Sequence, residues 1–228
     1  MSPFEVILQT LFPSTCACCG EVLAAGERQI CVGCLNRLSE THFSAMHDNP
    51  AERRLMGHLP LVAATSVYRF QQGGTVQQAV HAMKFHGCTE LCQMMGRQMG
   101  LDLLHSGRFD GVDLLLPVPL HWLRWLGRGY NQSELLCRGI AEVMPRQVLT
   151  TSLLRHRYTR QQSLQQGSRR VDNVSKAFSV RRVDALKGKH VLLVDDVLTT
   201  GATLTACADA LAAVPGIRIS VATFSIAM

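Results

Sequence analysis

The chain of 228 residues predicts an α/β fold, a parallel β-sheet covered by helices on both faces, with a small metal-binding element ahead of it. Short, continuously apolar runs alternate with amphipathic segments, as expected for parallel strands that are buried on both faces. Two Cys-x-x-Cys pairs lie close together near the start. Hydrophobic residues make up 47% of the chain and charged residues 18%, which allows a sizeable core and excludes a globally disordered chain. The formal net charge of +6 suits an anionic partner such as a phosphorylated metabolite or a nucleic acid.

The first residues of the chain, 1–14, predict a short amphipathic helix rather than a signal peptide. They contain an acid, Glu5, but no cationic segment and no cleavage site of small residues. No apolar run approaches the roughly 20 residues that a membrane-spanning helix needs. We therefore expect a cytoplasmic protein, in which cysteines are more often metal ligands or free thiols than disulfides.

The two cysteine pairs, Cys16 with Cys19 and Cys31 with Cys34, predict a structural zinc site. Two such pairs supply four thiolates to one tetrahedral ion and leave no coordination position open for chemistry. A segment with so few apolar residues would draw most of its folding free energy from the ion. The alternatives are buried free thiols or a thioredoxin-like redox pair, which would lie at the start of a helix beside a strand, where we expect neither pair. The remaining cysteines are expected in the core, and they are Cys18, Cys88, Cys92, Cys137 and Cys207.

The order of apolar and amphipathic segments defines the predicted elements. The strands are expected at residues 61–70, 113–120, 189–194 and 218–227. The helices are expected at residues 75–85, 89–106, 133–144 and 202–214. We expect residues 1–58 to form the N-terminal helix and the four-cysteine module, and residues 59–228 to form the α/β domain. The interval 156–176 is polar, basic and glutamine-rich, which indicates either a solvated excursion or a basic flap over an anion.

The stretch VLLVDDVLTTGATL, residues 191–204, predicts a ligand site at the end of a buried strand. The strand is expected to end at Val194, and ligands of parallel sheets bind beyond the carboxyl ends of the strands. The loop from Thr199 to Thr203 precedes a helix, whose first backbone N–H groups and dipole favour an anion. Asp195 and Asp196 lie about one sugar length away and can accept hydrogen bonds from neighbouring hydroxyls. The combination predicts a site for a ribose 5-phosphate.

Other nucleotide-binding patterns fit less well. A Walker B acid requires a G-x-x-x-x-G-K-[ST] loop, which the sequence lacks. A dinucleotide fingerprint requires G-x-G-x-x-G, and the nearest candidate, which begins at Gly127, has Gln132 at its last position. A receiver domain would carry its pair of acids near the start of the domain.

These motifs resemble those of a known family. Residues 191–204 are similar to the 5-phosphoribosyl 1-pyrophosphate (PRPP) motif of type I phosphoribosyltransferases, with four apolar residues, two acids and a TTGAT loop. LPVPLHWLRWLGRGYNQ, residues 116–132, and AMKFHG, which contains Lys84, resemble the competence protein F (ComF) branch, which includes the GntX-type proteins. The four-cysteine element is also typical of that branch. The flap positions that match its pattern are Thr159, Gln162, Arg170, Asn173 and Phe178. Gln165 and Arg169 depart from the pattern and make the flap more basic.

The resemblance implies a type I phosphoribosyltransferase fold that binds PRPP with Mg²⁺, in addition to structural Zn²⁺. Asp195 and Asp196 would contact the ribose hydroxyls and serve catalysis. The 5-phosphate would lie against Thr199, Thr200, Gly201, Ala202 and Thr203. The pyrophosphate would lie against backbone groups of Val118, Pro119, Leu120 and His121, with its charge offset by Lys84, Arg128, Arg157 and Arg170. Mg²⁺ prefers phosphate oxygens and water, so no separate metal motif is expected.

Some of these residues also have plainer explanations. Lys84 and Arg128 can each be solvated surface residues without a ligand. Trp122 and Trp125, three residues apart, are expected to serve ordinary packing, with stacking on the bases of single-stranded DNA as the alternative.

Two classes of function follow from the resemblance. The first is a phosphoribosyltransferase that displaces pyrophosphate from the ribose anomeric carbon through an oxocarbenium-like transition state, with an acceptor that the sequence does not identify. The second is a non-catalytic PRPP sensor or an adaptor that binds single-stranded DNA or other DNA-uptake proteins. The link of the family to natural transformation favours the second class, and the intact pocket motif favours the first. Both can hold at once, because a fold does not fix a function.

Overall fold

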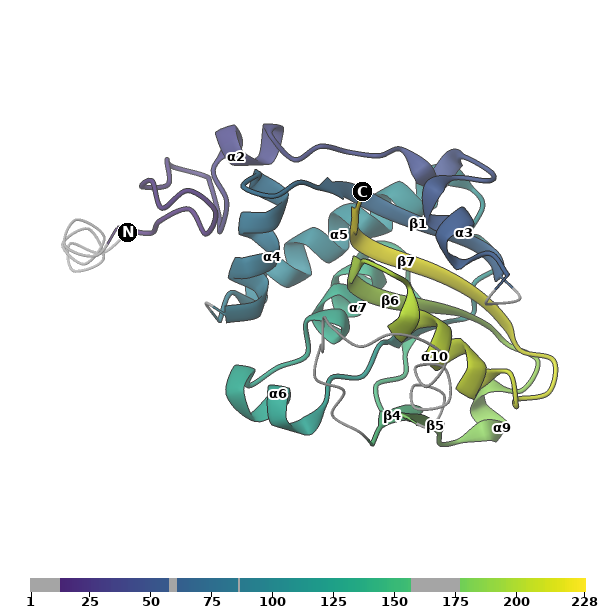
Figure 1. Cartoon of the computed structure of the whole chain (residues 1–228). Coiled ribbons are helices and arrows are strands. Elements are labelled where there is room, and N and C mark those ends of the chain that lie inside the picture. The colour runs from purple at the N-terminus through teal and green to yellow at the C-terminus, as the bar shows by residue number, and fades with distance from the viewer. Residues whose placement is uncertain (1–12, 58–60, 86, 157–176) are drawn as a thin grey trace, which may run out of the picture.

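The computed structural model describes residues 13–57, 61–85, 87–156 and 177–228 of the chain. Its centre is a five-stranded parallel sheet in the order β1-β7-β6-β2-β3 (Figure 1). The strands are β1 (Leu61–Phe70), β2 (Leu114–Pro117), β3 (Gln147–Val148), β6 (His190–Leu198) and β7 (Arg218–Ala227). The predicted parallel α/β architecture is therefore confirmed.

The helices alternate with these strands along the chain (Figure 1). The longer ones are α4 (Thr75–Phe85), α5 (Thr89–Ser106), α7 (Gln132–Val143) and α10 (Ala202–Leu211). The shorter ones are α2 (Val32–Asn36), the 3-10 helix η1 (Phe43–Ala45), α3 (Pro50–Leu55), α6 (Trp122–Arg128) and α9 (Val183–Leu186). A separate antiparallel pair consists of β4 (Leu153–Arg155) and β5 (Phe178–Val180).

The strand that contains the two neighbouring acids is longer than predicted. The expected end at Val194 is wrong, because β6 continues through Asp195 and Asp196 to Leu198. The ladder with β7 extends to the pair Leu198 and Ile226, which keeps this part of the chain in the sheet despite its carboxylates. Both acids therefore lie on a strand, whose regular backbone fixes the direction of their side chains better than a loop would.

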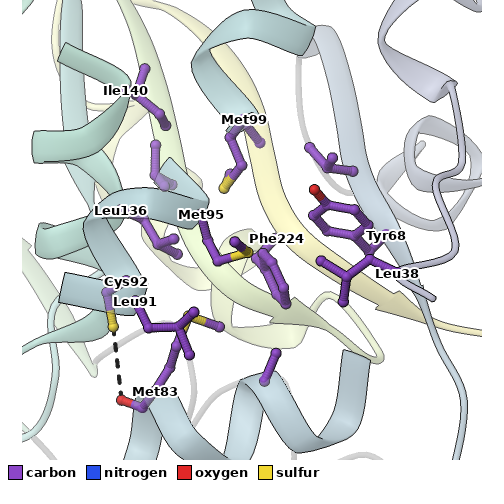
Figure 2. Packing of buried hydrophobic residues seen from close by; sticks show 14 of the residues in the cluster. Leu38, Tyr68, Met83, Leu91, Cys92, Met95, Met99, Leu136, Ile140 and Phe224 are labelled. Carbon is purple, nitrogen blue, oxygen red and sulfur yellow. Dashed lines mark hydrogen bonds between the residues drawn. The ribbon is translucent and has the colours of Figure 1, made fainter. Parts of the chain in front are cut away.

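Each face of the sheet packs against its own set of apolar side chains. Along β6, Leu192 and Val194 belong to the cluster formed with α4, α5 and α7, and Val191 and Leu193 to the cluster formed with α3 and α10. Figure 2 shows part of the first cluster, in which the side chains of α5 and α7 gather beside the ring of Phe224. This alternation is the period of two that a strand buried on both faces produces.

Close helix packing determines where α7 lies. A Cβ atom on Gly96 of α5 would be 2.3 Å from the backbone oxygen of Leu136, and one on Gly139 of α7 would be 2.1 Å from that of Gln93. The two helix backbones are thus in direct contact, which only glycine permits. This contact holds the first turn of α7 beside the carboxyl end of β6, where the acids lie.

The segment between the cysteines and β1 packs onto the sheet. Asn49 caps α3 through the backbone N–H of Ala51 at 2.9 Å, and its side-chain amide donates to Ala64 of β1 at 2.8 Å. Glu52 of α3 pairs with Arg108 at 2.6 Å, and both side chains are largely buried. The domain boundary expected at residue 58 stays a prediction, and α3 is attached to the sheet ahead of it.

Among residues 13–57, 61–85, 87–156 and 177–228, no helix has both the length and the apolar character needed to cross a bilayer. The predicted helix in residues 1–14 falls largely outside the described residues.

Candidate functional site

The carboxyl edge of the sheet gathers polar side chains from three elements. Lys84, near the end of α4, lies with its Nζ 2.8 Å from Oδ2 of Asp196. Ser133, in the first turn of α7, donates its hydroxyl to Oδ1 of Asp195 at 2.9 Å. The same oxygen accepts the backbone N–H of Asp196, also at 2.9 Å. The two acids are thus held in fixed and different ways, Asp196 by a cation and Asp195 by two neutral donors.

The electrostatics of this cluster differ between its members. Burial raises the pKa of the Asp195 carboxyl to about 7, and the neighbouring Asp196 carboxylate adds to the increase. The hydrogen bonds from Asp196 N–H and Ser133 and the charge of Lys84 oppose it. A carboxyl group in this state changes its protonation near neutral pH, which suits a group that exchanges hydrogen bonds with a polar ligand.

The segment RGYNQ, residues 128–132, connects the surrounding loops to one another. The Tyr130 hydroxyl donates to the Met83 carbonyl at 2.9 Å, which anchors the turn of α4 that carries Lys84. Asn131 caps α7 through Ser133 N–H at 3.1 Å and donates to the Val118 carbonyl at 3.0 Å. Arg128 donates to Gln132 at 2.8 Å and lies over the Phe85 ring at 5.2 Å. Burial lowers the pKa of Arg128, and the nearby Asp196 carboxylate acts in the opposite direction.

The sequence analysis predicted a ligand contact for Arg128 in this segment. It predicted none for Tyr130, Asn131 or the adjacent Ser133. Their roles depend on the fold, because each of these side chains forms a hydrogen bond to a residue on another segment of the chain. The available signal was the position of Ser133 immediately after the RGYNQ motif and that of Asn131 as a helix cap.

The loop after β6 begins a helix that is open to solvent. Thr199, Thr200 and Ala202 are exposed, and Gly201, at φ +82°, occupies the N-cap position of α10. The first turn of α10 contains no acid. A helix N-terminus without a carboxylate to occupy it favours a bound anion. The loop and the acid pair lie at the two ends of the same short stretch, with only Val197 and Leu198 between them.

The loop after β2 lies on the next strand of the sheet. Val118 uses its N–H in a 2.9 Å hydrogen bond to the Val194 carbonyl and its own carbonyl as the acceptor for Asn131. Both backbone groups of Val118 are therefore engaged within the protein, which argues against their expected contact with pyrophosphate. Pro119 and Leu120 are partly buried. His121 is buried, accepts Leu123 N–H through Nδ1 at 3.3 Å and so caps α6, while burial lowers its pKa.

Helix α6 presents its large apolar side chains to solvent. Trp122 is 60% exposed and Trp125 is 52% exposed. None of the residues of α6 is buried. The two tryptophans, expected to serve ordinary packing, each leave more than half of their surface exposed.

Two of the predicted flap cations, Arg157 and Arg170, lie outside the described residues, as do Thr159, Gln162 and Asn173. On the described borders of that interval, His156 N–H donates to the Ala177 carbonyl at 2.8 Å. Phe178 lies in β5, with the Arg155 guanidinium 5.4 Å from its ring.

The four cysteines predicted to bind metal form one cluster. Ligand atoms of Cys16, Cys19, Cys31 and Cys34 all lie within 4.8 Å of one another, and the sulfurs of Cys19 and Cys31 are 3.8 Å apart. Tetrahedral zinc with Zn–S bonds of about 2.3 Å separates its sulfurs by roughly 3.8 Å, so the spacing fits such an ion. Backbone N–H groups of Cys31 and Cys34 point at the sulfurs of Cys16 and Cys31, at 3.3 and 3.4 Å, which favours thiolates. The cluster can therefore hold a metal ion such as zinc.

Other features of the cysteines refine the predictions. Among the described residues, strand β1 begins only at Leu61, so the second pair does not follow a strand as a thioredoxin-like pair would, although Cys31 forms the N-cap of α2. Its sulfur faces those of the first pair, which favours metal binding over an isolated redox pair. Cys18 is not one of the four cysteines whose sulfurs gather, which agrees with its expected role outside the cluster. Cys92, Cys137 and Cys207 are buried as expected, whereas Cys18 and Cys88 are partly exposed.

Comparison with known proteins agrees with this architecture. The phosphoribosyl transferase domain family matches residues 133–225. DNA utilization protein YhgH of Escherichia coli (strain K12) is 29% identical over 211 residues, which cover 87% of this chain and 91% of the relative. A protein of the same name from Salmonella typhi is 32% identical over 135 residues, 58% of this chain and 59% of the relative. Competence protein F of Haemophilus influenzae is 37% identical over 95 residues, 40% of this chain and 41% of the relative.

The parallel sheet and the domain match define a type I phosphoribosyltransferase-like protein. Within that class, the chain is similar over 87% of its length to DNA utilization protein YhgH and over 40% of its length to competence protein F. The four-cysteine cluster expected from the resemblance to the competence protein F branch is also present.

Proposed function

We propose that the carboxyl edge of the sheet binds PRPP together with Mg²⁺. The observation that carries this proposal is the arrangement along β6, where two held acids and a solvent-open helix start are separated by two residues. The acids would accept hydrogen bonds from the ribose hydroxyls, and the loop from Thr199 to Thr203 would take the 5-phosphate. A phosphate and a diol at this separation match one phosphorylated ribose.

The cations around the acids would receive the pyrophosphate. Lys84 and Arg128 both lie near Asp196, and the loop at Pro119 and Leu120 ends the neighbouring strand. Arg157 and Arg170 stay part of this proposal from the sequence. Mg²⁺, when bound, would supply positive charge to the phosphate oxygens, for which the oxygen-rich ligand and water provide the preferred coordination.

In a transfer reaction, the residues of this chain would act chiefly by electrostatics. Lys84 and Arg128 would offset the charge of the departing pyrophosphate, and the Asp195 and Asp196 carboxylates would favour the positive charge that develops on the ribose ring. Ser133 would keep Asp195 oriented toward the ribose. The acceptor of the phosphoribosyl group is not defined by any residue described above, so catalysis is proposed only as substitution at the anomeric carbon.

The cellular role proposed for the chain is the use of external DNA. Relatives carry the names DNA utilization protein and competence protein F, and the similarity covers 87% of this chain for the first and 40% for the second. We place this activity in the cytoplasm. Binding of single-stranded DNA is a second candidate, favoured by the exposed Trp122 and Trp125 of α6, with Arg124 between them. Aromatic side chains next to cations are suited to stacking with bases.

The experiment is thermal unfolding of the zinc-loaded protein with and without PRPP and Mg²⁺, in wild type and in the double variant Asp195→Asn with Asp196→Asn. PRPP at 100 times its Kd should stabilise the wild type by about 2.7 kcal/mol. The variant should show little or no ligand-dependent shift relative to its own ligand-free midpoint. Absence of a shift in the wild type would remove the ligand assignment.

The DNA-binding candidate is tested separately with a single-stranded oligonucleotide. Its affinity should survive the two Asp→Asn changes, fall as salt rises and fall in Trp122→Ala with Trp125→Ala. An affinity that ignores the tryptophans would exclude α6 as the contact.

A further inference from the structure

Helix α3 contacts the loop that follows β6, although it precedes the α/β domain in the sequence. The Nη1 atom of Arg54 donates to the carbonyl of Thr199 at 2.9 Å and lies 3.5 Å from that of Leu198. The same atom also contacts the carbonyl of Ala227, the last residue of β7. A single guanidinium nitrogen therefore gathers the carboxyl ends of the two strands beside the proposed phosphate loop.

Arg54 and its neighbour Arg53 differ in the groups that their guanidinium charges contact. The Arg54 side chain is partly buried, and no carboxylate among the described residues lies within ion-pair distance of it. Arg53, in contrast, pairs with Asp48 at 2.6 Å, and both of these side chains are exposed. The positive charge of Arg54 is thus directed at backbone carbonyls and is not neutralised by an acid.

The next residue of α3 packs directly against the loop. Leu55 is fully buried, and a Cβ atom on Gly201 would lie 2.8 Å from its Cδ2. Gly201 also has φ +82°, a conformation that residues with a side chain rarely adopt. The N-cap of α10 is therefore pressed against α3, and the position of one depends on the other.

These contacts determine the direction of the donors in the loop. In a planar trans peptide the C=O of one residue and the N–H of the next point in opposite directions. Fixing the Leu198 and Thr199 carbonyls at Arg54 therefore directs the N–H groups of Thr199 and Thr200 away from α3. The positive charge of Arg54 also offsets the partial negative charge of three carbonyl oxygens, which would otherwise disfavour a nearby anion.

We propose that Arg54 is a positioning residue for the 5-phosphate, and that α3, which lies between the four-cysteine cluster and β1 in the sequence, is a structural part of the ligand site. This inference rests on the proposed function, because it assigns the loop from Thr199 to Thr203 to the 5-phosphate. Arg54 acts through the loop backbone. It makes the site depend on a segment that lies outside residues 133–225, the part matched by the domain family.

The test compares Arg54→Gln with the matched control Arg53→Gln by calorimetric titration of the full-length, zinc-loaded protein. The probes are ribose 5-phosphate, PRPP with Mg²⁺, and pyrophosphate with Mg²⁺. Arg54→Gln should weaken binding of ribose 5-phosphate and PRPP by about 10- to 100-fold, as expected when hydrogen bonds to a charged group are lost. Pyrophosphate should bind to it within about twofold of wild type, since its proposed contacts are on other loops. Arg53→Gln should bind all three probes like wild type.

Each outcome is decisive. Unchanged binding of ribose 5-phosphate by Arg54→Gln, with PRPP binding intact in the wild type, would overturn this inference and leave the proposed function standing. Equal losses for ribose 5-phosphate and pyrophosphate would also overturn it, because that pattern indicates a merely structural role. Failure of the wild type to bind PRPP would overturn the proposed function and this inference with it. If Arg54→Gln does not fold, Arg54→Lys, which keeps the charge but not the planar fork, should give the same selectivity with a smaller loss.

Discussion

The two polar clusters of the molecule relate to stability in opposite ways. The cluster of four cysteines joins two short chain segments with few apolar side chains, so a bound metal ion would stabilise the fold there. The cluster at the carboxyl edge of the sheet buries a carboxyl group whose pKa is raised by burial and by a like charge, which disfavours the folded state at neutral pH. The comparison teaches that a metal ion at the first cluster would add to stability, whereas the raised pKa of Asp195 at the second cluster costs stability, as expected if that cluster binds a ligand.

Removal of the metal should have the largest effect. With Cys16→Ser and Cys19→Ser, residues 13–38 should lose their protection from amide hydrogen exchange, because structural zinc sites contribute apparent free energies of about 10–16 kcal/mol. Strand β6 should stay protected, since its ladder with β7 does not involve the cysteines. Hydrogen exchange with mass spectrometry and measurement of bound zinc check this. Cys18→Ser is the control and should keep its metal. Unchanged protection of residues 13–38 in the metal-free protein would show that the metal does not stabilise this segment.

The next effect is expected at Gly201, in the loop between β6 and α10. Gly201→Ala adds overpacking against Leu55, of about 1–3 kcal/mol, to the strain of its positive φ. Gly129→Ala is the matched control, because Gly129 has φ +78° but nothing within 4 Å of an added Cβ, so only about 1 kcal/mol is expected. Denaturant unfolding measures both. Equal losses for the two variants would show that α3 does not constrain the loop.

Asp195→Asn should stabilise the protein while it weakens PRPP binding. Asparagine keeps an Oδ1 acceptor for Ser133 and Asp196 N–H but removes the buried charge. The pKa of Asp195 is raised from its ordinary value of 3.8 to about 7 in the folded protein, so wild type loses stability relative to the variant as pH rises from about 4 to 7. Above that window the difference should be constant, on the order of 1 kcal/mol or more. Urea unfolding at several pH values measures it.

The control for this prediction has the opposite sign. The His190 backbone N–H holds the pKa of Asp113 below its usual range, so Asp113→Asn should destabilise the protein at neutral pH and match wild type in acid. If Asp195→Asn is less stable than wild type at pH 8, the buried Asp195 carboxylate does not destabilise the fold, and this part of the account is wrong.

The smallest effect is expected from Ser133→Ala. Loss of this hydroxyl removes one donor to the Asp195 carboxylate, at a cost of about 0.5–1.5 kcal/mol, and should raise the pKa of Asp195 further. Ser152→Ala is the matched control, because the Ser152 hydroxyl is fully buried and has no hydrogen-bond partner among the described residues. It should be neutral or stabilising. NMR titration of the Asp195 carboxyl would sharpen the comparison, and an unchanged pKa would show that Ser133 does not tune it.

The sequence predicted the long elements well because their apolar patterns are strong. The expected segments 61–70, 75–85, 89–106 and 218–227 coincide with β1, α4, α5 and β7. The end of β6 was placed too early, since pairing with β7 and not local composition keeps Asp195 and Asp196 in the strand.

The candidate site was predictable only in part. Lys84, Asp195 and Asp196 were singled out from motifs, but the ion pair between Lys84 and Asp196 depends on the packing of α4 beside the sheet. The role of Arg54 was not predicted, because its partners, such as Thr199, are far away in sequence. The contacts are also made to backbone carbonyls, which every residue has, so the type of the partner residue gives no signal. Trp125 was expected to serve ordinary packing, and the exposure of α6 cannot be predicted from a spacing of three residues.

The central claim is that a phosphorylated ribose binds at the loop after β6, and NMR of the ¹⁵N-labelled protein tests it most directly. On addition of PRPP with Mg²⁺, the backbone amide resonances of Thr199 to Thr203 and of the first turn of α10 should shift, and those of α6 should not. The account is contradicted if these amides stay unchanged at saturating PRPP, or if the shifts gather elsewhere on the molecule.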